Sequence, residues 1–233
     1  MWINTFRRLK KYVVENKLNL GIAYDGDGDR CLAVDENGEE IDGDKLMAII
    51  SQKLRKHRKL KKDTIVGTIM SNLGLNKYAR DNGLNFLQTK VGDRYVLEEM
   101  LKNDFNLGGE QSGHVILLDY NPTGDGILTS LMLIKSIFEE GKKASELNSL
   151  VKKYPQILVN AKVDSDKKYD YENDAEIKKE IQNLEKEFAG NGRVVIRPSG
   201  TEPLVRVMIE GENQEYISKK ATELAKLIEQ KLK

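Results

Sequence analysis

The feature that most constrains this chain is the alternation of apolar strand-like runs with helix-like segments between residues 42 and 150. Short apolar runs predict strands at 65–70, 86–89 and 115–118. The spacing of apolar residues predicts helices at 43–54, 72–82, 93–103 and 124–140. Strands that alternate with helices are typical of a parallel sheet with helices packed on its faces. We therefore predict an α/β domain with a parallel sheet over residues 42–153.

Two further regions flank this predicted domain. Residues 1–41 predict a helix at 5–16 and strands at 19–24 and 31–35, a mixed α/β fragment too small to fold alone. Residues 154–233 are more polar and predict a small α+β domain. Its strands are predicted at 157–163, 193–197 and 204–210, and its helices at 177–188 and 217–232. The expected fold class is α/β: a partial mixed domain, a parallel-sheet domain and a small C-terminal α+β domain.

Composition narrows the classes of function. The net charge is +1, so no overall field favours nucleic acid or a membrane surface as a partner. The basic run at 53–59 ends an amphipathic helix and lacks interleaved aromatic residues, which predicts a solvated helix end. Cys31 is the single cysteine, so we expect no disulfide framework and a reducing, cytoplasmic location. We expect neither a membrane span nor a signal peptide, since no run of the required length and composition is visible.

The first motif with chemical content is Asp25-Gly26-Asp27-Gly28-Asp29-Arg30, which lies between two apolar runs. In an extended segment the alternate carboxylates Asp25, Asp27 and Asp29 point to one side and repel one another unless a cation lies among them. Oxygen ligands of this kind suit Mg²⁺. An EF-hand loop is disfavoured because Arg30 stands where that motif needs glycine and because the flanks are strand-like. A plain acidic turn leaves three acids between two apolar strands unexplained.

A second motif, Gly108-Gly109-Glu110-Gln111-Ser112-Gly113-His114, precedes the predicted strand at 115–118. Its glycines would let the backbone approach a ligand closely. Glu110 and Ser112 offer the acceptors and the donor that sugar hydroxyls require, and His114 is suited to proton transfer near neutral pH. A glycine-rich turn with a histidine satisfied by the backbone explains the same residues, so both interpretations stay open on the residues alone.

A third motif, Arg197-Pro198-Ser199-Gly200-Thr201-Glu202-Pro203, lies between two predicted strands, and Arg206 follows it. Two guanidinium groups, two hydroxyls and the amides around Gly200 form a set of donors suited to a phosphate dianion. The prolines stiffen the loop, which lowers the cost of ordering it on binding. A polar hairpin turn is the alternative, but it leaves this density of phosphate-type donors unexplained.

Taken together, the three loops in this order resemble the α-D-phosphohexomutase family over essentially the whole chain. The resemblance implies a phosphosugar substrate and a bound Mg²⁺. It implies metal ligands at Asp25, Asp27 and Asp29, with Arg30 beside the transferred phosphoryl group. It also implies that Glu110 and Ser112 bind sugar hydroxyls and that His114 transfers a proton. The phosphate that is not being transferred would be bound by Arg197, Ser199, Gly200, Thr201 and Arg206.

The resemblance also implies a phosphoserine in a Ser-His-Asn-Pro type loop, and this sequence contains no such loop. We therefore expect the chain to correspond to the C-terminal half of such an enzyme, to be inactive alone, and to act with an N-terminal half or as a homo-oligomer. The runs at 91–96 and 196–211 resemble most the branch of the family that acts on glucosamine phosphates. Branches that act on mannose or glucose phosphates, and a non-catalytic phosphosugar-binding module, are the alternatives.

Overall fold

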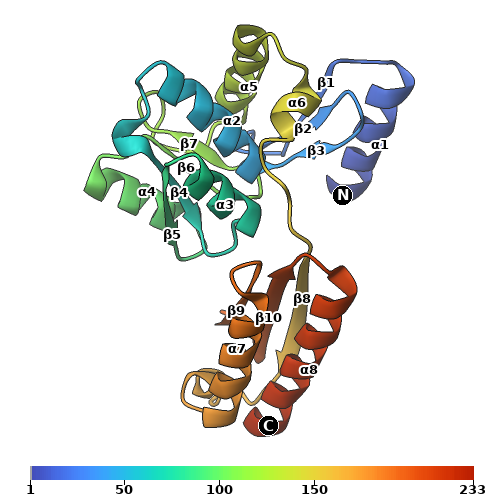
Figure 1. The fold of residues 1–233 in the computed structure, drawn as a ribbon, viewed down its shortest axis with the longest axis vertical. Coiled ribbons are helices and arrows are strands. Elements are labelled where there is room, and N and C mark those ends of the chain that lie inside the picture. Colours follow the sequence, from blue (N-terminus) through green and yellow to red (C-terminus); the bar gives the residue numbers. More distant parts are fainter. Residues whose placement is uncertain (1) are drawn as a thin grey trace. The chain divides into compact units, whose positions relative to one another are not determined.

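The computed structural model describes residues 2–233, which form two compact units (Figure 1). The first unit ends at Lys152, and the second runs from Lys153 to Lys233. The mixed α/β class expected from the sequence is confirmed. In the part of the chain that the structure describes, no helix is long and apolar enough to span a bilayer.

The main sheet of the first unit has the strand order β5-β4-β6-β7. Its strands are β4 (Thr64–Thr68), β5 (Asn85–Thr89), β6 (Leu107–Gly109) and β7 (Val115–Leu117). β4 and β5 are parallel as predicted. β6, which the sequence does not predict, is parallel to β4, whereas β7, predicted as part of the parallel sheet, runs antiparallel to β6. Only residues 110–114 separate β6 from β7, whereas a parallel return needs a crossover connection of a dozen or more residues. The short loop therefore makes a hairpin, and the sheet is mixed.

Helices cover both faces of this sheet. They are α2 (Gly43–Lys56), α3 (Leu73–Asp81), α4 (Asp93–Asn103), α5 (Gly126–Glu140) and the short α6 (Ala144–Asn148). The larger core joins α2, α3 and α5 to one face and includes the fully buried Leu46, Ile50 and Ile65. A smaller cluster joins α4 to the other face through Val96 and Met100. α2 is buried along most of its length, so the loops that flank it are held rigidly.

The N-terminal segment adds a second, antiparallel sheet to this unit. Helix α1 (Trp2–Glu15) precedes the sheet β1-β2-β3, formed by β1 (Leu20–Tyr24), β2 (Cys31–Asp35) and β3 (Glu40–Ile41). Tyr24 Oη lies 2.6 Å from Ser130 Oγ of α5, and Asn148 Nδ2 donates to Asp35 Oδ2 at 2.7 Å. These bonds attach the segment to the helices of the larger sheet. The division at residue 42 into separate domains stays a prediction.

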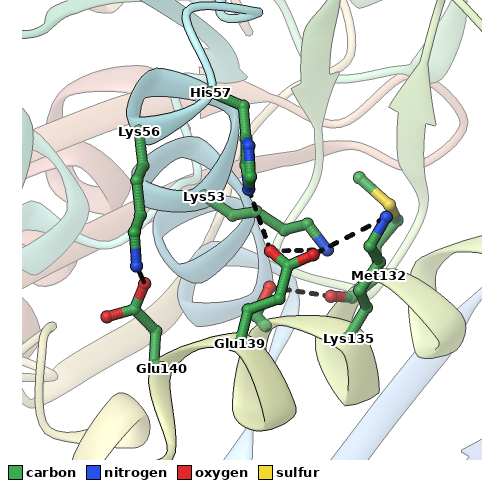
Figure 2. A network of polar contacts seen from close by, with 8 residues as sticks. Lys53, Lys56, His57, Met132, Lys135, Glu139 and Glu140 are labelled. Carbon is green, nitrogen blue, oxygen red and sulfur yellow. Dashed lines mark hydrogen bonds and ion pairs between the residues drawn. The ribbon is translucent and has the colours of Figure 1, made fainter.

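The basic run at the end of α2 is paired with acids on α5 rather than fully solvated (Figure 2). His57 Nε2 lies 3.0 Å from Glu139 Oε2, and Lys56 Nζ donates to Glu140 Oε1 at 2.7 Å. Lys53 Nζ lies 3.6 Å from the same Glu139 oxygen, and its side chain is only 6% exposed. The prediction of a solvated helix end is therefore wrong for Lys53, because α5 packs over this turn of α2.

The second unit is an antiparallel sheet covered by helices on one face (Figure 1). Its elements are β8 (Gln156–Lys162), α7 (Ala175–Phe188), β9 (Gly192–Pro198), β10 (Leu204–Gly211) and α8 (Gln214–Leu232). The strand order is β8-β10-β9. Val205, Val207 and Ile209 of β10 pack in the core with α7 and α8. Because side chains alternate along a strand, Arg206 points to the opposite face.

Candidate functional site

The acidic motif forms the loop between β1 and β2. Asp25 Oδ1 accepts hydrogen bonds from the backbone N–H groups of Gly28 at 3.1 Å and Arg30 at 3.3 Å. Arg30 Nε lies 3.7 Å from Asp25 Oδ2. Gly28 has a φ of +74°, a conformation that L side chains rarely adopt. Asp25 therefore holds the turn closed, while Asp27 at the tip is exposed.

The histidine-bearing motif lies directly against the acidic loop. Cys31 N–H donates to the Gly113 carbonyl at 3.0 Å, and Arg30 and His114 form an isolated antiparallel bridge. Gly113 has a φ of +96°, and a Cβ at this position would overlap the Cys31 carbonyl oxygen. Two loops that are far apart in the sequence are thus joined along their backbones. The buried Cys31 thiol has its pKa raised to about 12 by burial, so it is protonated at neutral pH.

The N-terminal ends of two helices complete this arrangement. Gly43 N–H of α2 donates to the Gln111 carbonyl at 3.0 Å, and Gly126 N–H of α5 donates to the Gly28 carbonyl at 2.9 Å. A Cβ on Gly126 would lie 2.6 Å from the Arg30 carbonyl oxygen, closer than real side chains come. Of the glycines predicted to let a ligand approach, Gly109 and Gly113 likewise lie against protein backbone, where a Cβ would meet the His114 and Cys31 carbonyl oxygens. Gly108 instead leaves room for side chains of α4, because a Cβ there would lie 2.6 Å from Met100 Sδ.

His114 lies at the centre of these contacts and is 4% exposed. Its Nε2 is 3.7 Å from Asp29 Oδ2 and 4.0 Å from Asp93 Oδ2. Its ring packs against Gly124, where a Cβ would overlap the ring atoms. Glu110 Oε1 accepts a hydrogen bond from Gly92 N–H at 3.1 Å, which ties the start of α4 to the same loop. The arrangement gathers acceptor oxygens and an imidazole at one end of the sheet.

The carboxylate oxygens of the acidic loop are suited to bind a hard cation. The Asp29 Oδ1 atom is buried and has no hydrogen-bond partner among the described residues, which is the environment of a carboxylate oxygen that accepts an ion. Among residues 2–233, no three acidic, histidine or cysteine side chains already stand in a metal-binding cluster. The exposed Asp27 side chain and the buried Asp29 oxygen nevertheless fit a magnesium ion bound at the mouth of the loop. The assignment of all three aspartates as ligands stays a prediction.

The third motif forms the loop between β9 and β10 in the second unit. Arg197 and Arg206 are directly opposed across the two strands. Like charges in this position destabilise a strand pair. Arg197 Nε is buried without a hydrogen-bond partner among the described residues, and burial together with the neighbouring Arg206 lowers the pKa of the Arg197 guanidinium. Two opposed cations with an unused buried donor favour an anion between them.

The loop itself presents its polar groups around a buried serine. Ser199 is 2% exposed, and its hydroxyl accepts from Glu202 N–H at 3.3 Å. Gly200 and Thr201 are exposed at the tip. Lys168, which sequence reasoning missed, donates from Nζ to the Ser199 carbonyl at 3.1 Å. It lies in a charged stretch far from the motif, so no local pattern pointed to it.

Family models match both units of the chain. The protein-family model for phosphoglucomutase/phosphomannomutase, alpha/beta/alpha domain III, matches residues 42–154 of this chain. The model of the C-terminal domain of the same enzymes matches residues 158–227. The chain therefore belongs to the phosphoglucomutase/phosphomannomutase family, as the three motifs led us to expect.

Three curated relatives named phosphoglucosamine mutase are similar to this chain over most of its length. A phosphoglucosamine mutase of Clostridium botulinum is 59% identical over 225 residues, which cover 97% of this chain and 50% of that protein. The phosphoglucosamine mutase of Alkaliphilus oremlandii is 59% identical over 94% of this chain and 49% of that protein. The phosphoglucosamine mutase of Caldicellulosiruptor saccharolyticus is 57% identical over 96% of this chain and 50% of that protein. The chain thus spans about half the length of the curated relatives it matches.

Solved structures agree on the fold. The N-acetylphosphoglucosamine mutase of Aspergillus fumigatus matches with a TM-score of 0.73 and 22% identity, over 90% of this chain and 48% of that chain. An N-acetylglucosamine-phosphate mutase of the α-D-phosphohexomutase superfamily also matches with a TM-score of 0.73 and 22% identity, over 94% of this chain and 52% of that chain. At this identity the likeness concerns the fold alone.

Proposed function

We propose that the chain carries the metal-, sugar- and phosphate-binding half of a phosphoglucosamine mutase. Such an enzyme interconverts glucosamine 6-phosphate and glucosamine 1-phosphate on the route to UDP-N-acetylglucosamine and peptidoglycan. The observation that carries the proposal is the opposed pair Arg197 and Arg206, with a buried guanidinium nitrogen that has no partner among the described residues. Support for the amino-sugar branch comes from the identity of 57–59% to phosphoglucosamine mutases.

The acidic loop would bind Mg²⁺ through Asp25, Asp27 and Asp29. A bound Mg²⁺ would neutralise charge on the phosphoryl group as it is transferred. Arg30, whose side chain is 47% exposed beside Asp25, would lie next to the same group. A structural neighbour, the N-acetylphosphoglucosamine mutase of Aspergillus fumigatus, has been solved in complex with GlcNAc-6P and magnesium, which supports this metal.

The sugar and its second phosphate would be bound by the other two loops. Glu110 and Ser112 would bind sugar hydroxyls, and His114 would hold or pass a proton at its Nε2 atom, which faces Asp29. The distal phosphate would be bound by Arg197, Arg206, the Ser199 and Thr201 hydroxyls and the amide of Gly200. Positioning of this kind supplies most of the catalysis in phosphoryl transfer.

The reaction also needs a phosphoserine that gives its phosphoryl group to the sugar and takes the other phosphate back from the bisphosphate. The 233-residue chain contains no Ser-His-Asn-Pro type loop. We therefore propose that the chain turns over no sugar phosphate alone and acts with an N-terminal half, which supplies the phosphoserine; a homo-oligomer of this chain would not supply it. A cytoplasmic location follows from the substrates of such an enzyme.

The decisive experiment is a chimera in which the N-terminal half of the Clostridium botulinum relative is fused to this chain at the aligned position. We expect the chimera with Mg²⁺ and glucose 1,6-bisphosphate to convert glucosamine 6-phosphate, and the chain alone to show only background. The Arg197→Ala chimera should lose most of this activity. A chimera that prefers mannose 6-phosphate or glucose 6-phosphate would replace the proposal with phosphomannomutase or phosphoglucomutase activity. Turnover by the chain alone would refute the missing-phosphoserine proposal.

A further inference from the structure

The carboxylate of Asp93 stands beside the candidate sugar site without a strong partner. Asp93 is the first residue of α4, and its side chain is 64% exposed. Among the described residues, its one polar side-chain contact is His114 Nε2 at 4.0 Å, beyond hydrogen-bond distance. The neighbouring Arg94 does not neutralise the Asp93 carboxylate, because its guanidinium is paired with Glu98 one turn further along α4. Arg94 Nε donates to Glu98 Oε1 at 2.7 Å. Asp93 is therefore an available anion.

The backbone holds Asp93 in this place. Gly92 precedes it with a φ of +128° and donates its N–H to Glu110 Oε1. The start of α4 is thus attached to the loop that carries Glu110 and His114. The other carboxylates of the site have other roles, since Glu110 accepts from Gly92 and Asp29 is assigned to Mg²⁺ in the proposed function. The N-terminal end of a helix also favours negative charge, so α4 complements the Asp93 carboxylate.

We propose that Asp93 determines specificity for amino sugars by accepting a hydrogen bond from the ammonium group at C2 of a glucosamine phosphate. This inference rests on the proposed function and adds the residue that distinguishes an amino sugar from its hydroxyl counterpart. A charge-assisted bond between a carboxylate and an ammonium group is about twice as strong as a bond between neutral groups. A 2-hydroxyl and a 2-acetamido N–H can also donate to the carboxylate, but neither group brings a positive charge, so the attraction between opposite charges is lost.

The test is calorimetric titration of the 233-residue chain with three sugar phosphates in the presence of Mg²⁺. The ligands are glucosamine 6-phosphate, glucose 6-phosphate and N-acetylglucosamine 6-phosphate. We expect Asp93→Asn to weaken binding of glucosamine 6-phosphate by about tenfold, the lower end of the range for a hydrogen bond to a charged group. Binding of the other two ligands should change by less than about threefold, because they carry no positive charge for the carboxylate to attract and Asn still accepts a hydrogen bond from them.

Glu99→Gln is the matched control, because it removes one negative charge from the same helix and keeps the acceptor for Asn103 Nδ2. It should leave all three affinities unchanged. An equal loss for all three ligands in Asp93→Asn, or no loss, would overturn the specificity role while leaving the proposed site in place. Wild-type chain that binds none of the three ligands would overturn the proposed function and the Asp93 assignment with it.

Discussion

The two candidate binding regions of this molecule are built in opposite ways. In the first unit the loops at 25–30 and 110–114 and the starts of α2 and α5 meet from four separate parts of the chain. In the second unit the phosphate-type loop is one hairpin between neighbouring strands. The first arrangement depends on close backbone contacts, whereas the second depends on a local run of polar residues. The groups that the hairpin presents can therefore be predicted from its own residues, whereas the contacts around the loops at 25–30 and 110–114 cannot be predicted from theirs.

Glycines show the difference most directly. A side chain on Gly113, Gly43 or Gly126 would overlap or crowd the backbone of another segment. A side chain on Gly200, in the hairpin of the second unit, would meet nothing within 4 Å. Gly43, Gly113 and Gly126 of the first unit therefore serve packing between segments, and glycine in the hairpin leaves its backbone amide accessible.

The largest effect that this comparison predicts is on stability. Gly113→Ala combines a positive φ with an overlap against the Cys31 carbonyl, so we expect the first unit to lose about 3 kcal/mol of unfolding free energy. Amide hydrogen exchange in β2 and β7 would measure this loss. Gly26→Ala and Gly200→Ala, which meet open space, should each change stability by less than about 0.5 kcal/mol. Equal effects of the three substitutions would contradict the proposed role of Gly113.

The second prediction is that one substitution in the second unit changes phosphate binding and stability in different ways. Arg197→Ala should weaken binding of inorganic phosphate by about tenfold or more, since a charge-assisted bond is lost. Stability should stay level or rise slightly, because the repulsion from Arg206 disappears. NMR titration with phosphate and urea unfolding would test both outcomes, with Lys219→Ala as a surface-charge control. A clear loss of stability would indicate a structural role for Arg197 instead.

A third prediction addresses the acidic loop. Asp27→Asn should weaken Mg²⁺ binding by about an order of magnitude, because a hard cation loses a full ligand charge. Phosphate binding by the hairpin should not change, since the substitution lies in the other unit. Calorimetric titration with Mg²⁺ measures the effect, and Glu15→Gln on α1 is the control for a lost surface charge. Unchanged Mg²⁺ affinity would exclude Asp27 as a ligand.

The smallest effect concerns the network between α2 and α5 (Figure 2). Burial lowers the pKa of Lys53, so the folded chain binds this proton less readily than the unfolded chain does. The resulting cost to stability is complete below the folded pKa and disappears as the pH rises to the ordinary value of 10.5. Lys53→Met should thus raise the unfolding free energy by up to about 1 kcal/mol at pH 7.

The gain in unfolding free energy from Lys53→Met should become smaller when urea unfolding is measured at pH values closer to 10.5. Glu139 keeps His57 and Lys135 as partners in this variant, so no isolated buried charge remains. Lys56→Met, at an exposed pair, should give no gain at any pH. A loss of stability in Lys53→Met at pH 7 would show that its ion pair outweighs the cost of burial.

Much of the secondary structure was predictable because local patterns were strong. The predicted helix at 93–103 and the strand at 31–35 coincide with α4 and β2. The sequence does not predict strand β6, because Leu107-Gly108-Gly109 has little intrinsic strand preference. Pairing with β4 and β7 makes this segment a strand, and close packing of Val96 and Met100 requires glycine at position 108.

The sequence by itself determined the class of fold, the order of the three motifs and the arginines of the hairpin, because each depends on residues that are neighbours along the chain. Only the tertiary structure decided which groups meet across the chain. It placed Asp93 near His114, Lys168 at the Ser199 carbonyl and Lys53 beneath α5. These contacts join segments whose separation in the sequence carries no periodic signal, since they arise from how helices pack on a sheet rather than from local backbone preference.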